Sequence, residues 1–477
     1  MLILERLIKS KTRFLPLILV LLFAVVTVYF GHVFRLVLAS GNYQIFVNWL
    51  IFGMTLIFTI QGIFTLLWML YAWENPLDVE NHRSPKDYAS PTLSFTALVP
   101  ARHEQTVIED TITAIARIDY PQGFKETLVI CRADDQKTIE NVRRIIKKLH
   151  DESIKIIILH DFPVNKPHSL NQGLLYAQNQ VIAIFDAEDQ PHSDIYQIIN
   201  TVMRKEKSDI VQSGIQLVNF NSHWFSALNV LEYFFWFKSG LLFFSQIGKV
   251  TPLGGNTVFI KKRLLEKIDG WDEDCLTEDA DIAIRATLAG AKTSVIYDER
   301  HTTHEETPPD VAGFIRQRTR WNQGFLQIIF KGYWLQLPSL RQKLTALYIF
   351  LSPFTECLAF IYLPVGLWIV FTQKIPEGLA LFSFIPFYLL LLQIAVLGLG
   401  FIEFLEGYHF KFLPIYLFKL LASYYPYQLL LMVSSFRAIG RAATNLTAWE
   451  KTTHVNAHRF GLPVMTKAVA SSVASLS

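Results

Sequence analysis

Residues 181–191 read Val-Ile-Ala-Ile-Phe-Asp-Ala-Glu-Asp-Gln-Pro, an apolar run that ends in an acidic cluster. The run at 181–185 is short and uncharged, which is typical of a buried strand. If the extended backbone continues, side chains at i and i+2 face the same way, so Asp186 and Glu188 converge while Asp189 points elsewhere. Two converging carboxylates suit Mg²⁺ or Mn²⁺, and the alternative is a solvated acidic turn.

Short apolar runs and helical stretches alternate on both sides of this strand. The expected strands are residues 93–99, 127–131, 154–159, 181–185 and 210–217, with helices at 106–116, 138–149 and 169–178 between them. Such alternation predicts an α/β domain of parallel strands joined by crossover helices. Ligands of open sheets of this kind bind at the carboxyl ends of the strands.

The chain also carries membrane segments, because 51% of its 477 residues are hydrophobic. Residues 14–39 hold Arg35 as their one charge and residues 44–73 hold none, so each is long enough for a hydrocarbon core of ~30 Å. A cleaved signal is disfavoured because the first stretch exceeds the usual apolar core of ~7–15 residues. Lys9, Lys11 and Arg13 favour a cytoplasmic start, which places the middle of the chain in the cytoplasm after two crossings.

Further apolar segments at 344–371, 379–401 and 413–435 predict a second membrane region. Three more crossings would put the C-terminus outside, whereas Arg437, Arg441 and Arg459 favour a cytoplasmic tail, so five and six crossings both stay open. The expected plan is two membrane helices at 1–74, a linker at 75–91, a cytoplasmic domain at 92–340, membrane helices at 341–436 and a cytoplasmic tail at 437–477. We expect a multi-pass protein of the plasma or inner membrane.

Several classes of function are disfavoured by composition and spacing. A net charge of +3 is too small to predict nucleic-acid binding. The cysteines Cys131, Cys275 and Cys357 are scattered without metal-ligand spacing, which argues against a disulfide framework or a zinc site. The histidines of residues 301–305, His-Thr-Thr-His-Glu, do not follow the order of the helical zinc motifs and are expected in a loop.

Polar residues follow other strands at the same expected edge. Each of these loops could equally be a turn or a helix cap, but all fall on one side of the sheet. They contain Pro100, Arg102 and Glu104 in the first, Asp134 and Asp135 in the second, Lys166 in the third, and the pair Gly254 and Gly255 before a strand at 258–260. Paired glycines allow a backbone to approach a ligand closely.

Two helices complete the set of candidate residues. Thr277 is the expected N-cap of a helix at 278–289 that begins with Glu278 and Asp279, although acidic first turns also simply stabilise the helix dipole. A second helix at 310–330 carries the pentad Gln317-Arg318-Thr319-Arg320-Trp321, with Gly324 on the face of Gln317. Arginine binds phosphate in bidentate fashion and an indole packs on a sugar ring, whereas the alternative is an amphipathic helix at the bilayer surface. The aromatic-rich residues 221–247 predict an interfacial helix.

Together these motifs resemble the membrane-integrated family-2 glycosyltransferases, which include cellulose, hyaluronan and curdlan synthases. The resemblance covers roughly residues 92–332 and implies a Rossmann-like GT-A fold without a glycine-rich fingerprint. It implies donor contacts by the first three loops, a metal held by Asp186 and Glu188, and Asp279 as general base beside Glu278. It assigns Trp321 to the acceptor, and Gln317, Arg318 and Arg320 to the diphosphate or acceptor region. This chain has Asp-Ala-Glu-Asp where the family has Asp-x-Asp, so Asp189 stays the alternative to Glu188.

The resemblance predicts an inverting, Mg²⁺- or Mn²⁺-dependent hexosyltransferase of class EC 2.4. We expect a nucleotide sugar, with UDP favoured, as donor, and elongation and translocation of a polysaccharide as the function. Transfer of one sugar to a lipid or lipid-linked acceptor is the alternative, and a non-catalytic transport or scaffold protein is disfavoured because the acidic residues are all present. Donor sugar, linkage and oligomeric state are not determined by these motifs.

Overall fold

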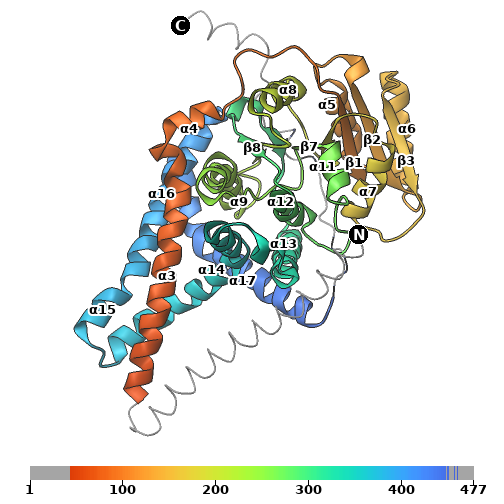
Figure 1. Cartoon of the computed structure of the whole chain (residues 1–477). Helices are drawn as coiled ribbons and strands as arrows, with labels where there is room; N and C mark the ends of the chain where they lie inside the picture. Colours follow the sequence, from red (N-terminus) through yellow and green to blue (C-terminus); the bar gives the residue numbers. More distant parts are fainter. Residues whose placement is uncertain (1–42, 447, 449, 451–455, 457–458, 460–477) are drawn as a thin grey trace, which may run out of the picture.

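The computed structural model describes residues 43–446 together with 448, 450, 456 and 459. A seven-stranded sheet has the order β3-β2-β1-β4-β7-β5-β8, and β6 pairs with β9 in a small second sheet. Figure 1 labels five strands of the large sheet, β1, β2, β3, β7 and β8. The strands are β1 Phe95–Ala101, β2 Lys125–Arg132, β3 Ile154–Leu159, β4 Val181–Ile184, β5 Ile210–Ser213, β6 Ile215–Leu217, β7 Val258–Lys261, β8 Thr293–Ile296 and β9 Thr303–Glu305. The α/β prediction is confirmed.

Helices cover both faces of the large sheet. Successive side chains of β1 point to opposite faces of the sheet. Ala97 and Val99 pack with α5, α6 and α8 on one face, while Leu98 packs with α7, α11 and α12 on the other. These helices are α5 Ile108–Ala116, α6 Gln136–Leu149, α7 Lys166–Tyr176, α8 Ile195–Glu206, α11 Lys262–Lys267 and α12 Glu278–Leu288. Because both faces are covered, the strands are continuous apolar runs, which explains why the sequence revealed them.

The sheet departs from the expected parallel arrangement at one strand. β1 is parallel to β2 and β4, but β7 runs antiparallel between β4 and β5. The chain leaves the large sheet after β5 and returns beside the carboxyl end of β4, where Thr257 N donates to Ile184 O at 2.7 Å. The expectation of parallel strands throughout was therefore wrong at this position.

The segment expected as one strand at 210–217 is two strands. The chain switches from the large sheet to the small one at Gly214, where a Cβ would lie 2.8 Å from the Tyr297 ring and 3.0 Å from Thr302. The missing side chain lets these two residues pack against the backbone. β6 then pairs in parallel with β9, from Ile215 opposite Thr303 to Leu217 opposite Glu305.

Among the described residues, three helical segments are long and apolar enough to cross a membrane: α3 Tyr43–Glu74, α14 Leu340–Thr372, and residues 377–407, which comprise α15 Glu377–Ser383 and α16 Ile385–Gly407. They match the expected spans at 44–73, 344–371 and 379–401, and indicate an integral membrane protein. The expected span at 14–39 lies outside the described residues. Of the expected linker, residues 76–81 form the short helix α4, Pro76–Asn81.

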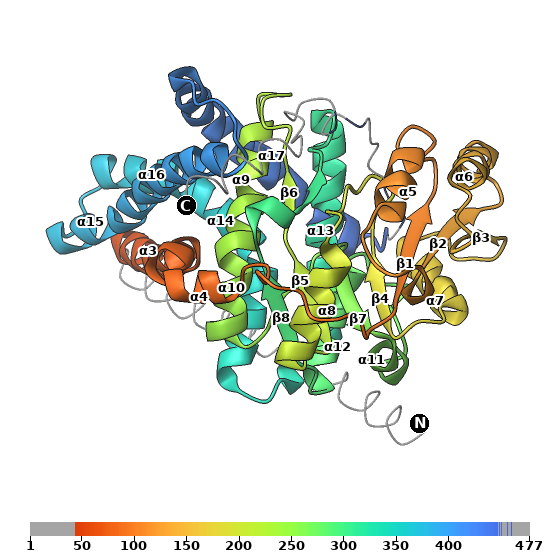
Figure 2. The same ribbon diagram turned by 90° about the horizontal axis from the view of Figure 1, so that it is seen from above.

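The expected span at 413–435 is a helix, α17 Pro414–Ala443, but it is not among those three segments. It packs along α13, Val311–Lys331, and Asn322 of α13 donates to Ser435 Oγ at 2.8 Å. In Figure 2, α17, α13 and α9 lie between the sheet and the candidate membrane helices. This layer joins the two parts of the molecule.

Most of the aromatic-rich segment at 221–247 is buried inside this joining layer, although residues 221–224 and Ile247 are exposed. Helix α9 Ser226–Phe235 continues through two π-helical turns, at Trp236–Gly240 and Phe244–Gly248, and packs against α3 and α16. Phe234, Phe237 and Phe244 are nearly inaccessible to solvent. The segment connects the domain to the candidate membrane helices. It does so as a largely buried helix, because other helices cover it on several sides, and not as the expected helix at the membrane surface.

Candidate active site

A cavity of about 570 Å³ opens at the carboxyl ends of β1 and β4 and extends between α9, α13, α14 and α17. Most of the residues singled out in the sequence line it. They are Pro100, Arg102, Glu104, Lys166, Asp186, Glu188, Gly254, Gly255, Glu278, Asp279, Gln317, Arg318, Arg320 and Trp321. Asp134, Asp135 and Asp189 do not line it. One cavity thus brings together motifs that lie more than 200 residues apart.

The first loop is held in place by the second. Asp135 caps α6, and its carboxylate accepts hydrogen bonds from Thr138 N at 3.3 Å and from His103 N at 2.5 Å. His103 adopts a positive φ of 57°, a conformation that such a bond helps to stabilise. Asp134 accepts from Arg102 Nη2 at 3.1 Å. The two aspartates therefore lie behind the loop, where they shape the wall formed by Arg102.

The acidic loop after β4 separates its three carboxylates by a turn, and the expectation of continued extended backbone was wrong: β4 ends at Ile184, and Asp189 N donates to Asp186 O at 3.2 Å. Asp186 forms an ion pair with Lys166, and Glu188 is buried at the cavity wall. Asp189 is fully buried; it accepts from Asp186 N at 2.8 Å and from Asn256 Nδ2 at 2.7 Å. Both of its oxygens are thus engaged inside the protein, which favours Glu188 over Asp189 as the second metal ligand.

A further carboxylate, Glu305, lies in the same wall and was missed in the sequence. It ends β9 and is hydrogen-bonded to Asn256. It belongs to the His-Thr-Thr-His-Glu string at 301–305, whose expected loop was wrong, because residues 303–305 form a strand. Its position depends on the pairing of β9 with β6, which no local pattern announces. Burial and then the neighbouring Asp186 raise the pKa of Glu305 to about 7, with hydrogen bonding from Asn256 opposing the shift.

Glu188 responds to the same surroundings. Burial, followed by the charges of Asp186 and Glu305, raises the pKa of Glu188 well above its usual range. Grouped carboxylates of this kind are costly to ionise without a cation nearby. Their oxygens are the donors that Mg²⁺ and Mn²⁺ prefer, so Asp186 and Glu188 fit such an ion.

Lys166 supplies positive charge at this point. Burial lowers the pKa of Lys166, but the negative charges of Asp186 and Glu278 raise it by more, so the net shift of this pKa is upward. Lys166 Nζ also donates to Gly255 O at 2.8 Å. A Cβ at Gly255 would lie 3.4 Å from both Lys166 Nζ and Asp279 Oδ2, so the glycine backbone stands between the lysine and Asp279.

Asp279 and Glu278 occupy the first turn of α12. Thr277 is the N-cap residue as expected, but its side chain makes no capping hydrogen bond, because it packs against Gly324 of α13. A Cβ at Gly324 would overlap the Thr277 side chain, so this glycine lets α13 approach the start of α12. That contact brings the pentad to Asp279.

Burial affects the protonation of both acidic residues. It raises the pKa of Glu278 to about 7, with Asp279 adding to the shift and Lys166 and Arg320 opposing it. It also raises the pKa of Asp279, against hydrogen bonding from Ala280 N and the charges of Lys166 and Arg320. A carboxylate with a raised pKa is a stronger base than an exposed aspartate.

The two arginines of the pentad point to different surroundings. Arg320 faces the acidic turn of α12, and its Nη1 donates to Leu276 O at 3.3 Å. Arg318 pairs with Glu232 of α9 and lies over the Trp321 ring, 4.6 Å from its centroid. Arg318 therefore belongs to the membrane side of the cavity, whereas Arg320 belongs to the side of Asp279.

The cavity continues into the candidate membrane helices. There its wall includes Ser352 and Glu356 of α14 and Gln428 of α17, residues that the sequence reading did not single out. Apolar neighbours such as Ile349 and Leu431 surround them. Polar side chains in a span commonly line a pathway or a binding site.

Part of the tail also reaches this region. Glu450 pairs with Arg437 and Arg441, and Arg459 donates to the backbone oxygens of Glu188 at 3.0 Å and Asp189 at 3.1 Å. Of the neighbouring residues 449–452, Glu450 is the one that the structure describes. Arg459 therefore contacts the loop that carries the candidate metal ligands.

Comparisons with known proteins identify residues 91–324 with the family model described as Glycosyltransferase like family 2. A beta-monoglucosyldiacylglycerol synthase of Nostoc is 27% identical over 242 residues, 50% of this chain and 50% of its own. A poly-beta-1,6-N-acetyl-D-glucosamine synthase of Staphylococcus epidermidis is 24% identical over 269 residues, 56% of this chain and 62% of its own. The match thus spans about half to three fifths of these relatives.

Among solved structures, the mannosyltransferase PcManGT of Pyrobaculum calidifontis, in complex with GDP-Man and Mn²⁺, matches with a TM-score of 0.48 and 19% identity. The match covers 83% of this chain and 99% of that one.

Proposed function

This chain belongs to glycosyltransferase family 2, and from that premise we propose that it transfers a sugar from a nucleoside-diphosphate donor to an acceptor hydroxyl with inversion at the anomeric carbon. One observation carries the proposal: Asp279, Lys166 and Gly255 meet in the same cavity as Asp186 and Glu188. A base, a cation and a carboxylate pair are the parts that such a displacement needs.

The donor lies at the sheet edge in this proposal. The loop of Pro100, Arg102 and Glu104 forms one wall for the nucleoside, and Lys166 faces the diphosphate. A Mg²⁺ or Mn²⁺ ion held by Asp186 and Glu188 would neutralise negative charge on the leaving diphosphate. We favour UDP as the nucleotide, as the sequence resemblance implies.

Asp279 acts as the general base. Its carboxylate takes the proton from the acceptor hydroxyl while that oxygen forms a bond to the anomeric carbon, and the bond from this carbon to the diphosphate breaks. A single displacement inverts the configuration and needs no covalent intermediate. The raised pKa of Asp279 supports this role, because a base with a pKa nearer neutrality accepts a proton more readily.

The acceptor enters from the side of the helices. We propose that it is a growing glycan, because Glu356, Ser352 and Gln428 supply hydrogen-bonding groups beyond Trp321, where a saccharide chain would leave the reaction centre. A lipid acceptor is the second candidate, favoured by the apolar residues Ile349 and Leu431 in the same wall. The two relatives described above include a polysaccharide synthase and a glycolipid synthase, which keeps both candidates in view.

The experiment uses the full chain in lipid nanodiscs with a panel of UDP- and GDP-sugars and Mg²⁺ or Mn²⁺. Release of nucleoside diphosphate identifies the donor, and mass spectrometry of the product measures its length. A series of products that grows with time supports elongation, whereas one sugar on a diacylglycerol supports the second candidate. No donor-dependent release with any sugar, with or without added diacylglycerol or oligosaccharide, would overturn the proposal of transfer.

A further inference from the structure

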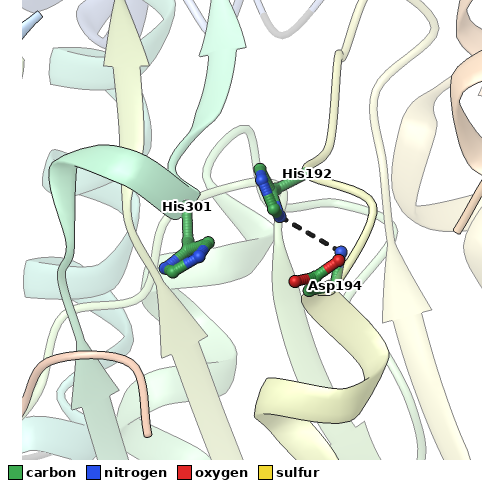
Figure 3. A group of neighbouring side chains, drawn as sticks. All are labelled: His192, Asp194 and His301. Carbon is green, nitrogen blue, oxygen red and sulfur yellow. Dashed lines mark hydrogen bonds between the residues drawn. The ribbon is translucent and has the colours of Figure 1, made fainter. Parts of the chain in front are cut away.

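Two histidines and an aspartate meet outside the cavity. His192 and Asp194 lie just before α8, and His301 ends a short 3₁₀ turn, Glu299–His301, after β8. One ligand atom from each residue lies within 4.8 Å of the other two, and Figure 3 shows the side chains converging from two segments. In the described part of the chain this is the one such group of three or more histidine, cysteine or acidic side chains.

The histidine on the first segment presents an unprotonated ring nitrogen. His192 Nδ1 accepts a hydrogen bond from the backbone N of Asp194 at 3.1 Å, so this nitrogen carries no proton, and a metal ion would take its lone pair in place of that hydrogen bond (Figure 3). An unprotonated imidazole nitrogen is the form that binds a metal. The two imidazole rings have centroids 4.6 Å apart and are nearly perpendicular, at 81°, so they do not stack on one another.

Neighbouring groups orient the other two side chains. Asp194 accepts hydrogen bonds from Tyr88 OH at 3.1 Å and from Ser193 Oγ at 2.9 Å, one on each oxygen, which leaves lone pairs on both. His301 Nδ1 lies 3.6 Å from Asp298 Oδ2, and Asp298 is nearly fully buried. A carboxylate behind a histidine and hydroxyls behind a carboxylate are the supports that metal ligands usually have.

The ligand chemistry selects the ion. Two imidazoles and one carboxylate suit Zn²⁺, whereas Mg²⁺ and Mn²⁺ prefer oxygen ligands such as those of Asp186 and Glu188. The nearby cation Arg300 is paired with Asp298 at 2.7 Å, so its charge is largely compensated. We propose that His192, Asp194 and His301 form a Zn²⁺ site that is separate from the donor site and leaves at least one coordination position for water.

The position of this site gives it a structural consequence. His192 follows the loop of Asp186 and Glu188, and His301 precedes Glu305; between them Gln190 and His304 exchange backbone hydrogen bonds at 3.2 Å. Bound Zn²⁺ therefore clamps the two segments that carry the acidic wall of the cavity. Cysteine spacing and the local order of histidines argued against a zinc site, but this group forms only when residues more than 100 positions apart in the chain meet.

The test measures Zn²⁺ binding to the untagged full chain in detergent by isothermal titration and by elemental analysis after gel filtration. We expect about one equivalent of Zn²⁺, and a loss of affinity of at least ~10-fold in His192→Ala and in His301→Ala. His223→Ala is the matched control, because His223 is exposed, lies outside the group and stacks on Phe225. The control should bind Zn²⁺ as the unmodified chain does.

Two further measurements separate this site from the donor site and from misfolding. The double variant Asp186→Asn/Glu188→Gln should keep its Zn²⁺ equivalent, and Zn²⁺ should raise the melting temperature of that variant but not of His192→Ala. Co²⁺ bound to the unmodified chain should give visible absorption that is absent from His301→Asn. The proposal is overturned if the chain binds no Zn²⁺, if both histidine variants bind it unchanged, or if binding disappears with the donor-site pair.

Discussion

The two ends of the cavity are built in different ways. At the sheet edge, the wall comes from strand ends and the first turns of helices, and its charges are carboxylates facing the cations Lys166 and Arg320. At the membrane end, the wall comes from the faces of long helices, where Arg318 is paired with Glu232 and covered by Trp321. The first end gathers several carboxylates around two cations, whereas at the second end the arginine is paired and Glu356 adds one further carboxylate to the wall.

That difference indicates a division of labour. Buried carboxylates with raised pKa values, such as Glu278 and Glu305 at about 7, are costly to the empty protein and suit a site that receives cations and transfers protons. A compensated arginine and an indole cost little and suit recognition of a neutral sugar. Substitutions at the sheet edge should therefore change the chemical step, and those at the membrane end should change acceptor binding.

The largest effect is expected at Asp279. Asp279→Asn keeps the shape of the side chain but removes the base, so kcat should fall by ~10²–10⁴-fold with little change in donor KM. The measurement is the rate of nucleoside-diphosphate release at saturating donor and acceptor. Asp274→Asn, at an exposed position shortly before the same helix, is the control, and its kcat should be close to that of the unmodified enzyme. An Asp279→Asn enzyme with unchanged kcat would rule out the assignment of the base.

Glu188 and Asp189 should differ sharply although they are neighbours. Glu188→Gln is expected to weaken the apparent Mg²⁺ or Mn²⁺ affinity by ~10–100-fold, as loss of a metal-supporting carboxylate does, while the melting temperature stays close to normal. Asp189→Asn should instead lower the melting temperature, because an amide cannot accept from both Asp186 N and Asn256 Nδ2.

The expected cost for Asp189→Asn is about 1–3 kcal/mol of unfolding free energy, from a buried donor left without an acceptor. Metal titration of activity and thermal unfolding, applied to both variants, distinguish the two roles. The reverse result, with metal affinity lost in Asp189→Asn and stability lost in Glu188→Gln, would exchange the assignments.

A smaller effect is expected at the membrane end. Trp321→Ala should raise the acceptor KM by ~10-fold, which corresponds to about 1.4 kcal/mol, while kcat at saturating acceptor changes little. Trp321→Phe keeps an aromatic face and should recover part of the loss. Trp49→Ala, on the exposed surface of α3, is the control for general effects of losing an indole. A change confined to donor KM would contradict the prediction, because it would place Trp321 on the donor side of the reaction centre.

The smallest effect concerns pH. Burial raises the pKa of Asp279, and the charge of Arg320 is one of the groups that oppose this shift, so Arg320→Gln should raise that pKa further. A base must be deprotonated to act, and therefore the acid limb of the kcat profile should move to higher pH, with activity lost at pH 6 more than at pH 8. Arg320→Lys keeps the charge and should leave the limb nearer its original position. A shift to lower pH would contradict the role of Arg320.

Local pattern was sufficient for much of this molecule. Three elements were predicted to within a residue or two: the strands Ile154–Leu159 and Val181–Ile184 and the helix Glu278–Leu288. Buried strands and capped helices are recognisable from adjacent residues alone. The antiparallel β7 and the break at Gly214 were missed. Both depend on how segments distant in the chain return to the sheet. The hydrophobic pattern of a strand does not tell whether it runs parallel or antiparallel to its neighbours.

The same division applies to the site. The sequence by itself predicted that Asp186 and Glu188 lie at the sheet edge, because the carboxyl ends of parallel strands share an edge, and the family resemblance added Asp279 to them. Only the tertiary structure decided that Glu305 joins them, that Arg318 and Arg320 face different partners, and that His192, Asp194 and His301 meet. These contacts form between elements far apart in the chain, and their geometry is fixed by packing such as that of Gly324 on Thr277, which no single stretch of sequence contains.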